Sequence, residues 1–213
     1  MELIKVQKSY GDHQIFKDLS FRFEAGNIYA LIGKSGSGKT TLLNMMAKLE
    51  AWNGGQIIYR GKALESYKER TFFEKELGYL FQNLGLIENA SVAENLDLGL
   101  VGKKMSKEEK KQAFRDVLAK VNLSYLPLDR KIYTLSGGEA QRISVGKLML
   151  KKPSLLLADE PTASLDPKTA DEILKLVFQM RDPERLIIIA THSPEIWQPV
   201  SYTHLRAHET LRY

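Results

Sequence analysis

The stretch Gly33-Lys34-Ser35-Gly36-Ser37-Gly38-Lys39-Thr40 decides the fold of this chain. It matches in full the P-loop pattern G-x-x-x-x-G-K-[ST], in which backbone N–H groups surround phosphate oxygens. The apolar run Ile28–Ile32 before it is typical of a buried strand, and we predict a helix after it, from Lys39 to about Leu49. The N-terminus of that helix adds partial positive charge. The stretch therefore predicts a phosphate site between a strand and a helix.

Two side chains of this stretch have specific expected roles. Lys39 should reach the β- and γ-phosphates of a nucleotide, and the Thr40 hydroxyl should hold Mg²⁺. A flexible glycine loop without a ligand is the alternative, and the match at all positions in the right context argues against it. The candidate nucleotide-binding residues here are Gly33, Lys34, Ser35, Gly36, Ser37, Gly38, Lys39, Thr40 and Thr41.

A second apolar run, Leu155–Ala158, ends in the adjacent carboxylates of Asp159 and Glu160. In P-loop proteins an acid at such a strand end holds Mg²⁺, and a second acid can act as general base toward the attacking water. Ordinary loop charges after a strand are the alternative. Because parallel strands place their carboxyl ends on one rim of a sheet, we expect both acids near the P-loop.

The segment Leu135-Ser136-Gly137-Gly138-Glu139 has two compatible interpretations. It is a capping box, which opens a helix by reciprocal bonds between Ser136 and Glu139. A helix start with free N–H groups and a serine hydroxyl is also a second phosphate site. Two phosphate sites in one chain indicate that two chains share each nucleotide.

With these segments in place, the chain up to about Val200 resembles the nucleotide-binding domain of ATP-binding-cassette (ABC) transporters. Leu135–Glu139, followed by Gln141-Arg142, is similar to the family's signature motif. The resemblance implies further roles: Tyr10 stacks on adenine, Gln82 senses Mg²⁺ and the permease, and His192 contacts the γ-phosphate. It also implies that Ser164-Leu165-Asp166 communicates between the two chains. Each of these has a structural alternative when taken singly, such as a helix cap for Asp166.

The stretch from Gly78 to Asn89 most resembles small bacterial cassettes that serve lipoprotein-release, macrolide-export and bacteriocin-export permeases. One departure from the family is Val145-Gly-Lys147, where relatives usually show an Ala-Arg-Ala-like run. The resemblance implies an α/β fold: a P-loop NTPase (RecA-like) core, an antiparallel β edge and an inserted helical lobe, about residues 83–147. It also implies a homodimer that uses ATP and Mg²⁺ at head-to-tail shared sites. This dimer is expected to power a separate integral membrane permease in the direction of export.

The rest of the sequence supports this α/β organisation. Alternation at Glu2–Gln7 and Ile15–Phe23 predicts two early strands with a turn at Gly11-Asp12, and Gln56–Tyr59 and Leu77–Phe81 predict two more. Capping boxes at Ser91 and Ser106 indicate helices in the lobe. After Asp166-Pro167 opens a helix, Leu186–Ala190 predicts a buried strand and Ser193-Pro194 a last helix.

Composition narrows the class of protein. The chain has 213 residues, a formal net charge of +5 and no cysteine, which excludes disulfides and thiolate metal sites. Basic residues are scattered, so we expect no nucleic-acid partner. No apolar run reaches the ~20 residues of a membrane span. At the N-terminus, charged residues stand where a signal peptide would need an apolar run. We therefore expect a cytoplasmic protein, peripheral on the inner face of the membrane through its permease.

Two alternatives and one anomaly remain at this point. Some ABC ATPases act on chromosomes or ribosomes, and a cell-division type cassette pairs with a permease that moves no substrate. The ABC domain is expected to cover residues 1–200. Ser201–Thr210 resembles a peptide that arises where a reading frame runs into sequencing adapter. We therefore predict that residues 201–213 are a non-native, poorly ordered tail that leaves a sheet edge uncovered. His204 and His208 lie four residues apart but lack a third metal ligand.

Overall fold

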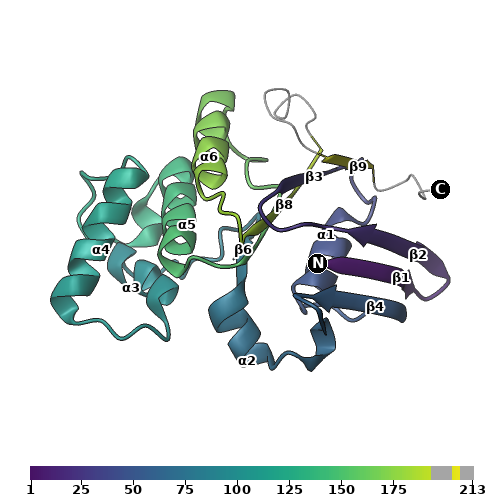
Figure 1. Cartoon of the computed structure of the whole chain (residues 1–213). Helices are drawn as coiled ribbons and strands as arrows, with labels where there is room; N and C mark the ends of the chain where they lie inside the picture. The colour runs from purple at the N-terminus through teal and green to yellow at the C-terminus, as the bar shows by residue number, and fades with distance from the viewer. Residues whose placement is uncertain (193–202, 207–213) are drawn as a thin grey trace. The chain divides into compact units, whose positions relative to one another are not determined.

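The computed structural model describes residues 1–192 and 203–206 of the chain (Figure 1). The chain divides into two compact units. The first consists of Met1–Tyr79, Ser154–Glu160 and Arg181–Tyr213, and the second of Leu80–Pro153 and Pro161–Met180. The α/β class and the antiparallel edge predicted from the sequence are confirmed. The helix predicted to begin at Ser193-Pro194 lies outside the described residues.

The first unit contains an antiparallel sheet of four strands in the order β2-β1-β4-β5. Strand β1 (Glu2–Tyr10) pairs with β2 (His13–Arg22), and the turn between them falls at Gly11-Asp12 as predicted. On its other side β1 pairs with β4 (Gly54–Tyr59), which continues through a tight turn into β5 (Lys62–Ala63). Buried side chains of β1, such as Leu3 and Val6, anchor this sheet.

The same unit contains the five-stranded sheet, in the order β6-β7-β8-β3-β9. Its central strands β7 (Leu155–Asp159) and β8 (Leu186–Thr191) are buried at every residue, as the continuous apolar runs predict for a parallel sheet covered on both faces. Strand β3 (Ile28–Ile32) has the predicted bounds and pairs parallel to β8, and β6 covers Leu77–Leu80. The carboxyl ends of β3, β7 and β8 therefore share one rim.

One prediction about the end of the chain is wrong. Residues Thr203–Arg206 form β9, which pairs parallel to β3 with Tyr29 opposite Thr203 and Ile32 opposite Arg206. The edge of β3 is therefore covered and not bare. Sequence reasoning sought a run of apolar residues, but strand pairing uses backbone N–H and C=O groups that every non-proline residue carries. The remaining tail residues and His208 lie outside the described residues.

The helical segments of the first unit differ from the prediction in length and number. Helix α1 (Lys39–Met46) ends earlier than expected, because Lys48 adopts a φ of 59° and the N–H groups of Leu49 and Glu50 turn back to the Asn44 carbonyl. Three short helical segments between β5 and β6 were not predicted. They are η1 (Leu64–Ser66), α2 (Glu69–Thr71) and η2 (Phe72–Glu76).

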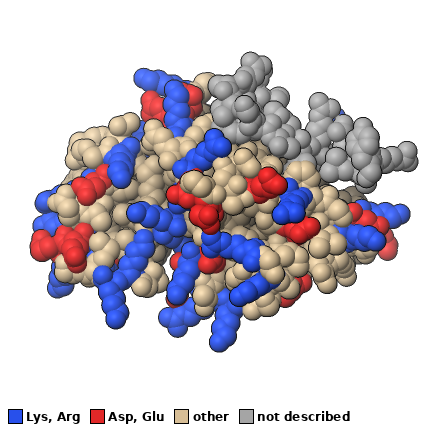
Figure 2. Space-filling view, viewed as in Figure 1, with Lys and Arg blue, Asp and Glu red and all other residues tan. Residues whose placement is uncertain are grey.

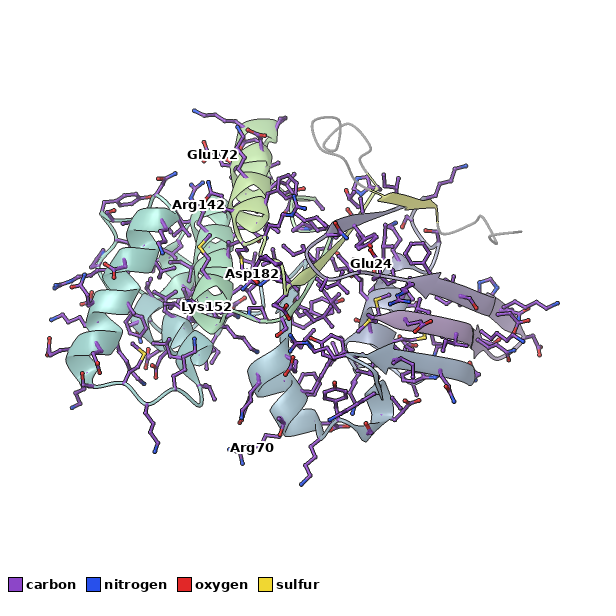
Figure 3. All side chains as sticks on the ribbon, in the orientation of Figure 1. Glu24, Arg70, Arg142, Lys152, Glu172 and Asp182 are labelled. Carbon is purple, nitrogen blue, oxygen red and sulfur yellow. The ribbon has the colours of Figure 1, made fainter. Side chains whose placement is uncertain are left out.

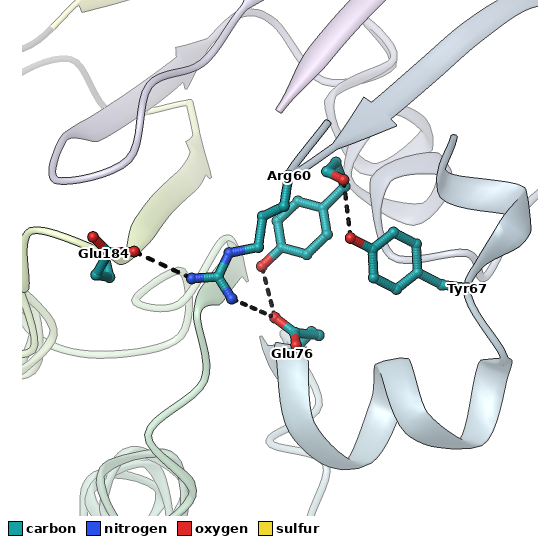
Figure 4. A network of polar contacts seen from close by, with 5 residues as sticks. Arg60, Tyr67, Glu76 and Glu184 are labelled. Atoms are coloured by element: carbon teal, nitrogen blue, oxygen red, sulfur yellow. Dashed lines mark hydrogen bonds and ion pairs between the residues drawn. The ribbon is translucent and has the colours of Figure 1, made fainter. Parts of the chain in front are cut away.

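A polar network fixes the β4–β5 turn within this unit (Figure 4). Arg60, at a φ of 47°, lies 3.3 Å from a carboxylate oxygen of Glu76 and 3.4 Å from one of Glu184. The Tyr59 hydroxyl also donates to Glu76, at 3.1 Å, and the Tyr67 hydroxyl donates to the Tyr59 carbonyl. Burial, reinforced by the Glu76 charge, raises the pKa of Tyr59 well above its ordinary value. The network joins the turn to the chain before β6 and before β8.

The second unit is helical, and serine begins three of its helices. Ser91, Ser106 and Ser136 each complete the predicted capping box, with the glutamate three residues later closing on the serine backbone. Asp166 caps α6 through the N–H groups of Lys168 and Thr169, with Pro167 as the first helical residue. The elements are α3 (Val92–Asp97), η3 (Leu98–Leu100), α4 (Lys107–Lys120), η4 (Ile132–Thr134), α5 (Gly137–Lys151) and α6 (Pro167–Gln179). This unit is therefore larger than the predicted lobe and includes α6.

Candidate functional site

The loop between β3 and α1 has the backbone geometry of a phosphate cradle. Gly36 and Gly38 adopt φ angles of 77° and 89°, a region that L side chains rarely enter. Gly38 is the N-cap of α1 and makes no side-chain cap bond, so the first N–H groups of the helix are not capped by a side chain. A Cβ atom on Gly38 would lie 2.7 Å from Cγ2 of Ile15 and 2.9 Å from Cζ of Phe16. Strand β2 therefore packs directly against the loop.

Lys39 is the cation of this loop, and its side chain is buried. Its Nζ donates to the carbonyls of Gly33, at 2.8 Å, and Lys34, at 3.2 Å. The same nitrogen lies 3.8 Å from Oε1 of Glu160. The ammonium is thus folded over the loop. Lys34, Ser35 and Gly36 are exposed on the loop, and Thr41 is half-buried in α1.

Asp159, the last residue of β7, is a buried acid with an incomplete set of partners. The Thr40 hydroxyl hydrogen-bonds its carboxylate, while Oδ1 has no partner among the described residues. Burial raises the pKa of Asp159 above its ordinary value, although the Thr40 bond opposes this. Ser37 Oγ, in the neighbouring loop, is likewise buried without a partner in the described part of the chain. Carboxylate and hydroxyl oxygens of this kind are the ligands that Mg²⁺ prefers, so the residues present fit that ion.

Glu160 follows Asp159 with an unusual backbone. Its φ of 46° is rare for a residue with a side chain, and its N–H donates to the Ala190 carbonyl of β8 at 3.0 Å. This turn sends the side chain toward the end of β8, where Oε2 lies 2.8 Å from Nδ1 of His192. The structure therefore brings Lys39, Glu160 and His192 together at the carboxyl rim of β3, β7 and β8.

Tyr10, at the end of β1, belongs to a small cluster with Lys8 and Glu50. Its hydroxyl donates to Glu50 Oε1, and the Lys8 Nζ lies 4.5 Å from the centroid of its ring. Lys8 Nζ also contacts Glu50 Oε1 at 2.8 Å and donates to the Ala51 carbonyl at 2.8 Å. The Tyr10 side chain is half exposed, so part of the ring remains open to a ligand.

The helix start at Ser136 forms the other predicted phosphate site, in the second unit. Ser136 N and Oγ donate to Glu139 Oε2 at 2.7 and 2.9 Å, and Glu139 N donates back to Ser136 Oγ at 3.3 Å. The Tyr125 hydroxyl donates to the other carboxylate oxygen at 2.8 Å. These bonds, led by the Ser136 backbone, lower the pKa of Glu139. Apart from its chain neighbours and the backbone of its own helix, no atom of the described residues lies within 4 Å of where a Cβ on Gly137 would stand, so this start is open.

Helix α5 holds two neighbouring segments of the second unit. Gln141 Nε2 donates to the Pro161 carbonyl at 2.7 Å, and Arg142 pairs with Glu172 of α6 at 3.0 Å (Figure 3). One turn further along the helix, Ser144 Oγ donates to the Leu84 carbonyl at 2.7 Å and Lys147 Nζ to the Gly85 carbonyl at 2.5 Å. Lys147, which belongs to the stretch that departs from the family pattern, thus holds the loop after Gln82 against α5.

The predicted site residues therefore fall into two groups. The first unit brings together Lys39, Thr40, Asp159, Glu160 and His192. The second unit contains Gln82, Ser136–Gly138 and Asp166. Gln82 is exposed, and Asp166 acts as the helix cap of α6.

Comparison with protein families matches residues 16–163 to the family described as ABC transporter. The chain belongs to the ABC transporter family. The match includes the phosphate loop, the Ser136 helix start and the acids that end β7. The family assignment made from the signature motif is confirmed.

Relatives within the ABC transporter family include both release and import systems. The chain is 36% identical over 204 residues to the lipoprotein-releasing system ATP-binding protein LolD of Buchnera aphidicola subsp. Acyrthosiphon pisum, covering 92% of this chain and 89% of the relative. It is 37% identical over 194 residues to the methionine import ATP-binding protein MetN of Clostridioides difficile, covering 90% of this chain and 60% of the relative. Similarity alone therefore leaves the direction of transport open.

A solved structure shares both the fold and the sequence pattern. It is described as a dimeric, post-hydrolysis state of the ATP-binding cassette MJ0796 bound to ADP and Pi. The two chains superpose with a TM-score of 0.84 at 25% identity, covering 97% of this chain and 94% of the other. With the family match, this makes the chain an ABC ATPase with a P-loop NTPase fold. No helix among the described residues is both long and apolar enough to cross a membrane.

Sequence reasoning missed Lys8 and Glu50, which surround Tyr10 in this ABC ATPase. Lys8 carried a signal, because residues two apart on a strand point to the same face. Glu50 carried none, since it lies 40 residues from Tyr10 and its contact depends on the turn after α1. On the face drawn in Figure 2, Lys and Arg are interspersed with Asp and Glu, in keeping with the scattered charge of the sequence.

Proposed function

We propose that two copies of this ABC ATPase pair head to tail and that each ATP lies between the P-loop of one copy and Ser136–Gly138 of the other. The observation that carries the proposal is the glycine-containing start of α5, where a Cβ on Gly137 would meet no packed neighbour among the described residues, in a chain that already has a complete phosphate loop. Such a helix start attracts phosphate through its free N–H groups and its dipole. The dimeric relative bound to ADP and Pi supports the same arrangement.

Within each site, Glu160 is the general base toward the attacking water. His192 contacts the γ-phosphate in this proposal, and its Nδ1 lies 2.8 Å from Oε2 of Glu160. Lys39 neutralises the β- and γ-phosphates. Thr40, Asp159 and Gln82 would hold Mg²⁺, which supplies charge neutralisation between the β- and γ-oxygens when bound. The protein thus acts mainly by positioning groups and by neutralising charge.

Three residues have roles around this centre. Tyr10 stacks on the adenine base, Gln82 relays the state of the site to the permease, and Asp166 communicates between the two copies. Asp166 accepts bonds from Lys168 N and Thr169 N, at 3.1 Å each, so its side chain has a fixed direction. The Tyr10 position beside the loop follows from its pairing with His13 of β2, the strand that contacts Gly38.

The dimer powers a separate integral membrane permease, in the direction of export, and binds the inner face of the cell membrane through it. The similarity to a lipoprotein-releasing ATPase and the Gly78–Asn89 stretch support this direction. ATP closes the dimer and hydrolysis reopens it. The permease is driven because the closed dimer binds ATP more tightly than the open one does. A cell-division type cassette is the alternative, and it would bind a similar permease without moving cargo.

The test is affinity purification of the tagged chain from native membranes, followed by a transport assay in vesicles made from them. We expect a stoichiometric membrane protein with four spans and a large extracytoplasmic domain, and cargo movement that Lys39→Ala abolishes. Recovery of that permease with no ATP-dependent cargo movement would favour the cell-division type. Recovery of ribosomal or DNA-bound proteins in place of a membrane protein would refute the transport role.

A further inference from the structure

Lys8 is a buried lysine that the proposed chemistry does not use. Only 8% of the residue is exposed, and removing an ammonium group from water is expensive unless other groups compensate it. Three groups do so here: the Glu50 carboxylate at 2.8 Å, the Ala51 carbonyl at 2.8 Å, and the Tyr10 ring with its centroid at 4.5 Å. A lysine over a ring in this way is held by a cation–π contact.

Glu50 completes the cluster, because it accepts from both partners. Its Oε1 accepts a hydrogen bond from the Tyr10 hydroxyl and also contacts Lys8 Nζ. Burial acts to raise the pKa of Glu50, but the hydrogen bonds from Lys8 and Tyr10 more than offset it, and the pKa lies below its ordinary value. The carboxylate is therefore ionised at neutral pH. Tyr10 is fixed at two points, its hydroxyl and one face of its ring.

The cluster stands beside the phosphate loop. In the register of β1 and β2, Lys8 lies opposite Phe16 and Tyr10 opposite His13. Phe16 and its neighbour Ile15 are the side chains that a Cβ on Gly38 would strike. Glu50 follows α1, the helix that begins in the same loop, and its N–H is bonded to Asn44 of that helix. The cluster therefore links the strand that bears Tyr10 to the far end of the phosphate-binding helix.

We propose that Lys8 and Glu50 are positioning residues for Tyr10, which hold its ring in the plane that stacks on the adenine of ATP. This inference rests on the proposed adenine-stacking role of Tyr10. Since the Lys8 ammonium occupies one face of the ring, the base stacks on the opposite face. A ring that is already fixed loses less conformational entropy when the base binds, so ATP binds more tightly.

A positioning role and a purely structural role of the ion pair predict different losses of affinity. Positioning of the ring should affect the binding of ligands that have an adenine base, whereas a structural defect should weaken the binding of any phosphate ligand. Inorganic tripolyphosphate has the phosphates of ATP and no base. Lys8→Met and Glu50→Gln should each weaken ATP binding about 3- to 10-fold and leave tripolyphosphate binding unchanged. Tyr10→Ala should weaken ATP binding about 10-fold or more, since base–aromatic stacking contributes on the order of 1–3 kcal/mol. Lys8→Arg keeps the cation and should restore most of the affinity.

The experiment is calorimetric titration of each full-length variant with ATP and, separately, with tripolyphosphate. The double variant Tyr10→Ala/Lys8→Met should bind ATP no more weakly than Tyr10→Ala, because Lys8 acts through the ring. Equal losses for ATP and tripolyphosphate, or additive losses in the double variant, would overturn the positioning role. If Lys8→Met does not fold, Glu50→Gln gives the same comparison with a change of one atom.

The outcomes also separate this inference from the function on which it rests. If Tyr10→Ala binds ATP as well as the natural chain, the adenine-stacking role of Tyr10 is wrong and the positioning role with it. If Tyr10→Ala weakens ATP binding while Lys8→Met and Glu50→Gln do not, Tyr10 keeps its role and the positioning inference alone is refuted.

Discussion

At the scale of single residues, the phosphate loop was predictable because its chemistry resides in local backbone geometry. Gly36 and Gly38 are glycines since their φ angles of 77° and 89° require it. Asp159 and Glu160 were predictable from a strand that ends in two acids. The ion pair between Lys8 and Glu50 was not, because it joins residues 42 positions apart through the path of the chain after α1.

The two glycines of the loop make a matched pair for a stability test. Gly38→Ala should destabilise the protein more than Gly36→Ala. Both place a side chain at positive φ, which costs about 1–2 kcal/mol. Only at Gly38 does the new Cβ also meet atoms, Ile15 Cγ2 at 2.7 Å and Phe16 Cζ at 2.9 Å. Urea unfolding of the two variants measures the difference, and equal free energies of unfolding would show that β2 yields without strain.

At the scale of elements, capping signals predicted where helices begin better than where they end. All three serine–glutamate boxes formed as expected, whereas α1 ended before Leu49. A helix start is encoded by side chains within one turn, while its end depends on tertiary contacts. The same reason explains why α2 and η2 were missed and why β9, held by backbone pairing, was not expected.

Two helix caps separate a structural role from a functional one. Ser106 and Ser136 make the same bonds, with distances of 2.7 and 3.3 Å to their glutamates. Ser106→Ala and Ser136→Ala should each lower the free energy of unfolding by about 1 kcal/mol. Only Ser136→Ala should also lower ATPase activity, by about 10-fold or more, because we propose that its hydroxyl binds the shared phosphates. Equal ATPase rates in the two variants would argue against a second phosphate site.

Lys147 of α5 should make the free energy of unfolding of the protein depend on pH. Burial, then the charge of Lys151, lowers the pKa of Lys147 from 10.5 to about 8 in the folded chain. Since the folded pKa lies below the unfolded one, the charged form opposes folding below pH ~8, and this penalty disappears as pH rises toward about 10.5. The natural chain should therefore gain stability relative to Lys147→Met across this interval. If the difference in free energy of unfolding between the two proteins did not change with pH, the burial of the charge would be contradicted.

The strand at the end of the described chain makes a further prediction. Deleting residues 201–213 removes β9, so the edge of β3 loses its partner groups over Tyr29–Ile32. The shortened chain should melt at a lower temperature and scatter more light, because unpaired strand edges promote association. That these residues are non-native stays a prediction. A shortened chain with unchanged melting temperature and solubility would show that the pairing does not contribute.

At the scale of the whole molecule, the proposed working unit is a pair of chains. The first unit has the groups that we propose bind and activate the nucleotide, and the second has the Ser136 helix start. In the proposed dimer each nucleotide needs the first unit of one copy and the second unit of the other. The family could be predicted from the sequence because its motifs occur in a fixed order. The permease and its cargo could not be predicted, because the permease is a separate protein.

Sedimentation velocity of Glu160→Gln in ATP and Mg²⁺ tests this central claim most directly. The amide preserves the shape of Glu160 but cannot take the proton of water, so ATP should persist in the site. We predict an ATP-dependent dimer that is absent with ADP. The variant Glu160→Gln/Ser136→Arg should bind ATP and remain a monomer. A monomeric Glu160→Gln at saturating ATP, or a dimer unaffected by Ser136→Arg, would contradict the shared site.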